Sequence, residues 1–303
     1  MDIPARLQEQ RESLFKNIGT VFHITEKMND TLVRAMSGAV FISIVIGSLY
    51  FGVYAGFVCL GLFTFLGLYE YFNLFRKSSS VSVSPVTGTF LGMLIFAIGS
   101  LAYMGEIHAA YTSVIIPIFF LGLLAELWRK KENPLVNIGI LLLGIFYVAI
   151  PFLCMVFIHT GSFLFENSAS HYSLIFMFLL IWSNDTFAYL SGRWFGKNKL
   201  FERISPKKTW EGTIGGIIMT VLVAAAIAYF SDRQDYLFWI FSAMIIAPCA
   251  IFGDLLESLF KRSLNIKDSG NIMPGHGGIL DRFDAALFAA PFFFCWWLFY
   301  SYF

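Results

Sequence analysis

The residues best suited to chemistry lie between 253 and 284, in a polar stretch that separates two strongly apolar segments. Four of them are spaced i, i+3, i+4 and i+7, which places them on one helix face: Asp254, Glu257, Ser258 and Lys261. After a glycine-rich segment, Asp281 and Asp284 follow at i, i+3 spacing and should share a face at the start of the next helix. We therefore expect two helix ends to direct Asp254, Asp281 and Asp284 towards one pocket.

Carboxylates gathered in this way are typical of sites for hard divalent cations, of which Mg²⁺ is the best fit. Basic residues lie beside them and would neutralise the oxygens of an anionic ligand: Lys261, Arg262, Lys267 and Arg282. Carboxylates, a metal and lysines together indicate phosphoryl or nucleotidyl transfer. Gly277 and Gly278 would let the backbone approach a polyphosphate closely. His276 would bind a phosphate or carry a proton.

Two further polar clusters precede this stretch. In residues 182–199, Asp185 lies about 9 Å inside the end of an apolar run, counting 1.5 Å per residue. In residues 205–212, a Ser-Pro turn at Ser205 leads to Lys207 and Lys208 just before the next apolar run. The positive N-terminal end of that helix would add to an anion-binding loop. The structural alternatives are a hydrogen-bonding hub for Asp185 and topological anchoring for the lysines.

The remaining composition indicates what must position these groups. The chain of 303 residues is 57% hydrophobic and 14% charged, whereas a soluble domain carries about 25% charged residues. Each apolar run is long enough for a bilayer core of roughly 30 Å. The apolar runs cover residues 34–51, 52–75, 86–105, 109–128, 135–158, 173–191, 212–230, 236–259 and 285–303.

The sequence thus predicts an all-α integral membrane protein, a polytopic bundle of about nine transmembrane helices with a polar active site on the cytoplasmic side. The segment GSLYFGVYAG between the first two runs is a weak turn, so eight spans or a tight hairpin remain open. Glu70 and Glu126 lie near the ends of early runs, and we expect them to snorkel or to pair with Arg76 and Arg129.

If the apolar runs cross the membrane in alternating directions, every Lys and Arg except Arg233 lies on the same side of the membrane. The positive-inside rule puts that side, and the N-terminus, in the cytoplasm. Residues 1–30 are predicted to form a cytoplasmic amphipathic segment, with a disordered tail as the alternative. Residues 31–170 would form the N-terminal transmembrane helices, and residues 171–303 a C-terminal catalytic transmembrane region.

Residues 258–284, here named the signature loop, read SLFKRSLNIKDSGNIMPGHGGILDRFD. This sequence resembles the signature of the phosphatidate cytidylyltransferases, also called CDP-diacylglycerol synthases. That signature runs Ser, two residues, Lys-Arg, four residues, Lys-Asp, a short spacer, His-Gly-Gly and finally Asp-Arg-x-Asp. Met273 stands where the family usually has Leu, Ile or Phe, which is a conservative change. NDTFAY and SPKKTWEG also resemble family segments, so the resemblance covers residues 182–284.

The resemblance implies that CTP and phosphatidate react to give CDP-diacylglycerol and pyrophosphate. It also implies dependence on Mg²⁺, with a second cation left open, and a homodimer in the lipid bilayer. The expected location is the bacterial inner (cytoplasmic) membrane, and no nucleic-acid partner is expected. By motif match, the acidic metal-binding positions are Asp254, Asp281 and Asp284.

Motif match and the chemistry of the residues together define the expected site. The expected catalytic residues are Lys207, Lys208, Lys261, Lys267 and Asp284. The expected substrate-binding residues are Ser205, Asp185, Arg262, His276, Gly277, Gly278 and Arg282.

There are three alternatives to this interpretation, and the first two are the stronger. One is another CTP-using membrane enzyme, such as a polyprenol or phytol kinase or a cytidylyltransferase for an ether lipid. The long signature disfavours the kinases but does not separate diacyl from ether lipids. Another is a secondary transporter, in which Asp185 and Asp254 would form an intramembrane ion site. Transporters place such groups near the midplane and often show paired repeats, and the chain shows neither. A structural scaffold would leave the acidic cluster unexplained.

Overall fold

The structure is a computed structural model that describes residues 35–76, 81–164, 172–231, 235–266, 268–270 and 277–302. The predicted amphipathic segment 1–30, Lys267 and His276 lie outside the described residues.

Within the described ranges, eight helical segments are long and apolar enough to cross a membrane. A 3₁₀ turn, Ala109–Val114, leads into α4, and a π-helical turn, Ile145–Ala149, joins α5 to α6. The helices are α2 (Val53–Arg76), α3 (Pro85–Tyr103), α4 (Ile115–Arg129), α5 (Pro134–Gly144), α6 (Ile150–Leu164), α7 (Ser173–Phe195), α8 (Trp210–Phe230), α9 (Tyr236–Ser263) and α10 (Leu280–Tyr302). The predicted all-α polytopic membrane fold is confirmed.

A shorter apolar helix, Ala35–Tyr50, precedes α2. The weak turn in the sequence is a real break, because the chain turns at Phe51 and Gly52. Gly52 has φ +114°, a conformation that residues with a side chain rarely adopt. The first two apolar runs therefore form two helices and not one.

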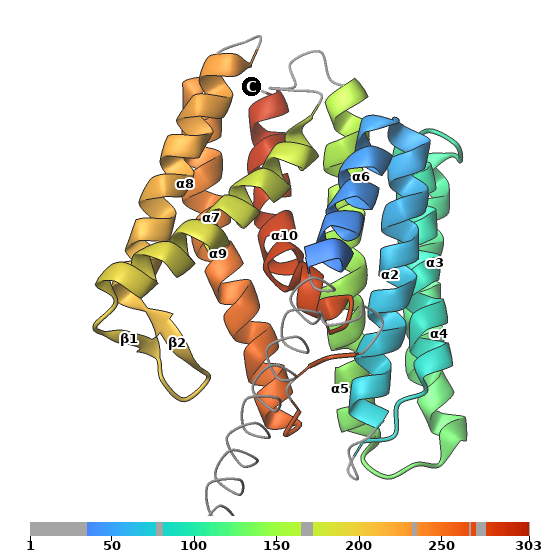
Figure 1. Cartoon of the computed structure of the whole chain (residues 1–303). Coiled ribbons are helices and arrows are strands. Elements are labelled where there is room, and N and C mark those ends of the chain that lie inside the picture. The colour runs from blue at the N-terminus through green and yellow to red at the C-terminus, as the bar shows by residue number, and fades with distance from the viewer. Residues whose placement is uncertain are drawn as a thin grey trace, which may run out of the picture.

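Helix α10 lies at the centre of the bundle and packs against α9 and α6 (Figure 1). Its Phe283 is 1% exposed and contacts aromatic rings from four other helices. These rings belong to Phe41, Phe63, Phe152 and Phe178. The start of α10, which carries Asp281 and Asp284, is thereby held where both halves of the chain meet.

Small residues bring α7 and α8 together. A Cβ atom at Gly212 would lie 2.7 Å from the backbone oxygen of Ala188 and 3.0 Å from Cα of Gly192. One helical turn further along α8, a Cβ atom at Gly216 would lie 2.9 Å from Cβ of Ala188. Both helices thus present residues of the small-xxx-small type, which lets membrane helices approach closely.

A two-stranded antiparallel hairpin stands where the sequence analysis expected only a loop. Strand β1 (Lys199–Phe201) pairs with β2 (Ser205–Thr209). The Glu211 carboxylate anchors the hairpin because it accepts hydrogen bonds from the backbone N–H groups of Lys197 and Asn198. Thr209 caps α8 by accepting a hydrogen bond from Gly212 N at 3.2 Å. Figure 1 shows the hairpin, the end of α9 and the α4–α5 connection at the same, lower end of the bundle.

Candidate active site

A cavity of about 360 Å³ opens beside the hairpin. It is lined by residues of α7, α8, α9 and β2. Four residues that the sequence analysis selected meet there: Asp185, Lys207, Lys208 and Asp254. The cavity thus combines acidic and basic groups at the end of an otherwise apolar bundle.

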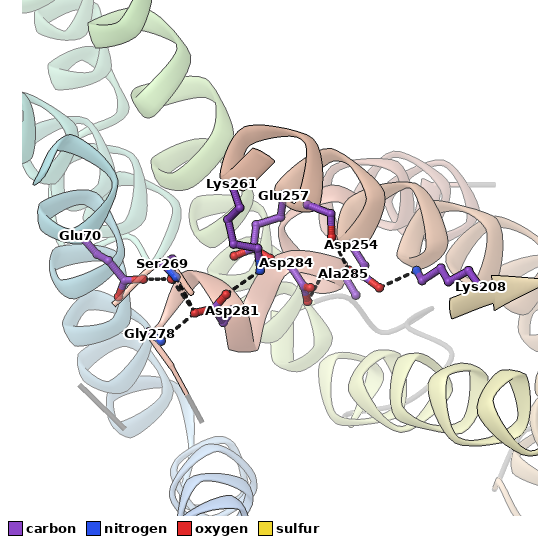
Figure 2. Close-up of polar contacts among 11 residues, drawn as sticks. Glu70, Lys208, Asp254, Glu257, Lys261, Ser269, Gly278, Asp281, Asp284 and Ala285 are labelled. Atoms are coloured by element: carbon purple, nitrogen blue, oxygen red, sulfur yellow. Dashed lines mark hydrogen bonds and ion pairs between the residues drawn. The ribbon is translucent and has the colours of Figure 1, made fainter. Parts of the chain in front are cut away.

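The hairpin and α9 are joined by an ion pair at this cavity. Lys208 Nζ lies 2.5 Å from Asp254 Oδ2, as Figure 2 shows. The other oxygen, Asp254 Oδ1, accepts a hydrogen bond of 3.3 Å from Ser258 Oγ, one helical turn along α9. The predicted common face at the end of α9 is therefore confirmed, and Asp254 projects from it to the cavity.

Further carboxylates lie near Asp254. Asp185 interacts electrostatically with both Lys208 and Asp254. Asp284, in the second turn of α10, interacts in turn with Asp254 and Asp185. One Asp284 oxygen accepts a hydrogen bond of 2.7 Å from Ala285 N. Three carboxylates from α7, α9 and α10 thus share one region, where Lys208 forms an ion pair with one of them.

The donor set of this region fits a hard divalent cation, because all its anionic donors are carboxylate oxygens. Among the described residues, no three His, Cys, Asp or Glu side chains form a ready-made metal site. Binding of Mg²⁺ here stays a prediction; Mg²⁺ commonly keeps several waters and binds through one or two carboxylates together with substrate phosphates.

Asp281 belongs to a second network, which lies on the other side of Asp284 in Figure 2. Its Oδ1 lies 2.7 Å from Lys261 Nζ. Its Oδ2 accepts hydrogen bonds from Ser269 N at 2.9 Å and from Gly278 N at 2.8 Å. Lys261 also pairs at 2.6 Å with Glu257, whose side chain is 3% exposed.

Both Asp281 oxygens are therefore engaged with groups of α9 and of the signature loop. The role of Asp281 as a metal ligand beside Asp254 and Asp284 stays a prediction, as do the phosphate-binding roles of Gly277 and Gly278. Gly277 has φ +81°, and a Cβ atom there would collide with the Asp281 carboxylate. The backbone turn beside Asp281 thus supplies a local reason for glycine at this position.

Glu70 of α2 gives a correction. We expected it to snorkel or to pair with Arg76. It does not snorkel, because it is 5% exposed and contacts the signature loop. The pairing with Arg76 involves a side chain outside those that the structure describes. Glu70 accepts a hydrogen bond from Ser269 Oγ and another, of 2.7 Å, from Ile279 N. The same expectation is confirmed for Glu126, which pairs with Arg129 at 2.8 Å.

Other selected residues lie elsewhere. Ser205 begins β2, Arg262 is exposed in the last turn of α9, and Arg282 lies in the first turn of α10. Within the described part of the chain, none of these three lines the cavity. Their binding roles stay predictions, and those of Lys267 and His276 concern residues outside the described ranges.

Tyr189 and Arg193 of α7 also line the cavity, although neither is among the residues expected from the sequence. They follow Asp185 at i+4 and i+8, and residues at this spacing lie on one helix face. That spacing is the signal that could have found them.

Comparison with known proteins identifies the family. A family model described as "Cytidylyltransferase family" matches residues 32–300. The phosphatidate cytidylyltransferase of Haemophilus influenzae is 34% identical over 284 residues, which cover 86% of this chain and 96% of that protein. The phosphatidate cytidylyltransferase of Staphylococcus aureus is 39% identical over 206 residues, which cover 65% of this chain and 76% of that protein. Because the family model spans nearly the whole chain, the chain belongs to the cytidylyltransferase family.

Proposed function

We propose that this protein transfers CMP from CTP to phosphatidate and so forms CDP-diacylglycerol and pyrophosphate. The similar proteins of Haemophilus influenzae and Staphylococcus aureus carry the name phosphatidate cytidylyltransferase. The observation that carries the proposal is the cavity in which Lys208 and Asp254 form an ion pair beside Asp185. A cationic group for phosphate and carboxylates for a metal are what the transfer requires.

In the proposed reaction, a phosphate monoester oxygen of phosphatidate attacks the α-phosphorus of CTP. A P–O bond to the lipid phosphate forms, and the bond between the α-phosphorus and the oxygen that bridges to the β-phosphate breaks. Pyrophosphate leaves with that electron pair. A phosphate monoester has a second pKa of about 6, so it is already ionised near pH 7 and needs no strong general base.

The main obstacle is the repulsion between two anions. Lys207, Lys208 and Arg193 line the cavity and would hold the phosphate oxygens of CTP. Lys208 would also stabilise the charge that develops on the pyrophosphate leaving group. Asp185 lines the same cavity and interacts electrostatically with Lys208.

Asp254 and Asp284 would hold Mg²⁺, since both carboxylates belong to the acidic region beside Lys208. When bound, Mg²⁺ supplies positive charge that screens the phosphates from one another. Asp281 would act indirectly on the site, because it binds Lys261 and the signature loop and so holds them in place.

The site is proposed to face the cytoplasm of a bacterial cell, at the inner membrane. The charged hairpin and the ends of α4 and α9 share one end of the bundle (Figure 1), and positively charged segments stay on the cytoplasmic side. CTP would enter from the cytoplasm, and phosphatidate sideways from the inner leaflet. From the family resemblance we also expect a homodimer, which native mass measurement would test.

The decisive experiment uses the purified full-length protein in detergent with Mg²⁺ and phosphatidate. CTP labelled on its α-phosphate is compared with CTP labelled on its γ-phosphate, and the lipid phase is counted. Label from the α-position alone supports CMP transfer, whereas γ-label in the lipid would show a kinase. An ether analogue of phosphatidate tests the choice of lipid. Folded protein that labels none of these lipids would contradict the proposal.

A further inference from the structure

The first half of the chain reaches the signature loop through one buried carboxylate. Glu70 projects from α2, and its Oε2 accepts a hydrogen bond of 2.7 Å from Ile279 N. Its Oε1 contacts Ser269 Oγ, and both side chains are about as buried as the apolar core. Figure 2 shows Glu70 facing Ser269 from the α2 side. One side chain thus contacts the loop at two points that are ten residues apart.

The loop backbone is shaped to this carboxylate. A Cβ atom at Gly270 would lie 2.9 Å from Cδ of Glu70, and a Cβ atom at Gly278 would overlap the carboxylate itself. Glycine at both positions therefore leaves room for the Glu70 carboxylate in its observed place. The loop thus has a glycine next to each of the two residues that hydrogen-bond to Glu70, and both glycines leave space for its carboxylate.

Ser269 passes the contact on to α10 and then to α9. Its hydroxyl lies 2.9 Å from Asp281 Oδ2, and Asp281 in turn pairs with Lys261. A continuous series of polar contacts therefore runs from Glu70 through Ser269 and Asp281 to Lys261 (Figure 2). Glu70 itself is not among the residues that line the cavity in the described part of the chain.

The number of protons in this series restricts which side chains can replace Glu70. The Ser269 hydroxyl has one proton and two carboxylate neighbours, so it can donate to only one of them. A carboxamide at position 70 would accept from Ile279 N through its oxygen and donate to Ser269 Oγ through its nitrogen. The hydroxyl proton would then be free for Asp281. Glutamine should therefore keep the network, and an apolar residue of similar volume should not.

We infer that Glu70 is a positioning residue for CMP transfer, which fixes the signature loop and, through Ser269, the carboxylate of Asp281. It acts through hydrogen bonds and not through its charge. The N-terminal helices accordingly serve as part of the catalytic framework as well as a membrane anchor. This inference rests on the proposed function only in its activity measurement.

The test compares Glu70→Gln with Glu70→Leu in the purified full-length enzyme. Glu70→Gln should keep kcat and the KM for CTP within about threefold of the parent. Glu70→Leu should lower kcat by about 100-fold, since a displacement of about 1 Å far from the reacting atoms can have that effect. Hydrogen exchange read by mass spectrometry should show faster exchange of the Ile279 amide region in Glu70→Leu and no change in Glu70→Gln.

Glu126 provides the matched control. It is a largely buried carboxylate on α4 that binds Arg129 and, at 2.7 Å, Asn137 Nδ2, away from the signature loop. Glu126→Gln and Glu126→Leu should leave kcat per folded enzyme and loop exchange unchanged.

Each other outcome overturns the inference. Full activity in Glu70→Leu would show that the contacts do not position the site, and inactive but folded Glu70→Gln would show that the negative charge is needed. If Glu70→Leu does not fold, Ser269→Ala removes the same link with a smaller change. It should lower kcat about tenfold with faster loop exchange, and parental behaviour would refute the inference. Because loop exchange is read without substrate, failure of CMP transfer in the parent enzyme is distinguishable from failure of this inference.

Discussion

Lys208 Nζ lies 2.5 Å from Asp254 Oδ2, so an ion pair joins strand β2 to helix α9 at the cavity. The two residues are 46 positions apart in the sequence and come from different polar clusters. Their pairing places the proposed phosphate-binding cation and the proposed metal-binding carboxylate side by side. This arrangement permits separate tests of the two proposed roles.

Lys208→Gln should lower kcat/KM for CTP by roughly 100-fold, because it removes a cation from the position where charge develops on the leaving group. Steady-state kinetics at saturating Mg²⁺ measure the effect. Lys199→Gln is the control, since Lys199 is an exposed lysine of the same hairpin and does not line the described cavity. Equal kinetics in both variants would contradict the role given to Lys208.

Asp254→Asn should raise the Mg²⁺ concentration that gives half-maximal activity by roughly tenfold or more, because a carboxamide is a weaker ligand for a hard cation. The measurement is a Mg²⁺ titration of CMP transfer after treatment with a chelator. Chelator alone should abolish transfer in the parent enzyme, and added Mg²⁺ should restore it. Glu202→Gln, in the hairpin turn, should leave the titration unchanged, and the same midpoint in Asp254→Asn would exclude Asp254 as a ligand.

Much of the fold could be predicted because the bilayer imposes a simple rule on length and polarity. The runs 109–128 and 236–259 correspond closely to the observed helices. The predicted run 285–303 begins later than the helix itself, since α10 starts at Leu280 and includes polar residues in its first turn. Apolar composition alone does not detect a helix start that carries Asp281 and Arg282.

The site could be predicted only in part. Spacing along one helix correctly placed Asp254 with Ser258 and Glu257 with Lys261. The contacts of Glu70 join residues that are 199 and 209 positions apart, and no periodic pattern records such a contact. Tertiary packing also decides which lysine pairs with which carboxylate. Asp254 pairs with Lys208 and Asp281 with Lys261, so the two carboxylates belong to different networks.

Lys261→Met should destabilise the protein by about 3–5 kcal/mol, because it leaves two largely buried carboxylates without their cation. These are Glu257 and Asp281, whose side chains are 3% and 7% exposed. Thermal unfolding in detergent, followed by tryptophan fluorescence, measures the change. Adding Glu257→Gln to Lys261→Met should recover part of the loss. If Lys261→Met unfolds like the parent and loses only activity, Lys261 acts on the phosphates and not on the loop.

Gly212→Ala should destabilise the protein by about 1–3 kcal/mol and lower CMP transfer, because overpacking forces neighbouring backbone apart. The added methyl group would meet the backbone of Ala188 and Gly192, which cannot rotate away as a side chain can. Separation of α7 from α8 would also move Asp185 relative to Lys208.

Gly139→Ala is the matched control, since a Cβ atom there has no neighbour within 4 Å among the described residues. Alanine should be neutral or should stabilise α5 by about 0.4–1 kcal/mol through reduced freedom of the unfolded chain. Thermal unfolding and CMP transfer are measured on both variants together. A Gly212→Ala protein as stable and active as Gly139→Ala would show that the close approach of α7 and α8 does not set the geometry of the cavity.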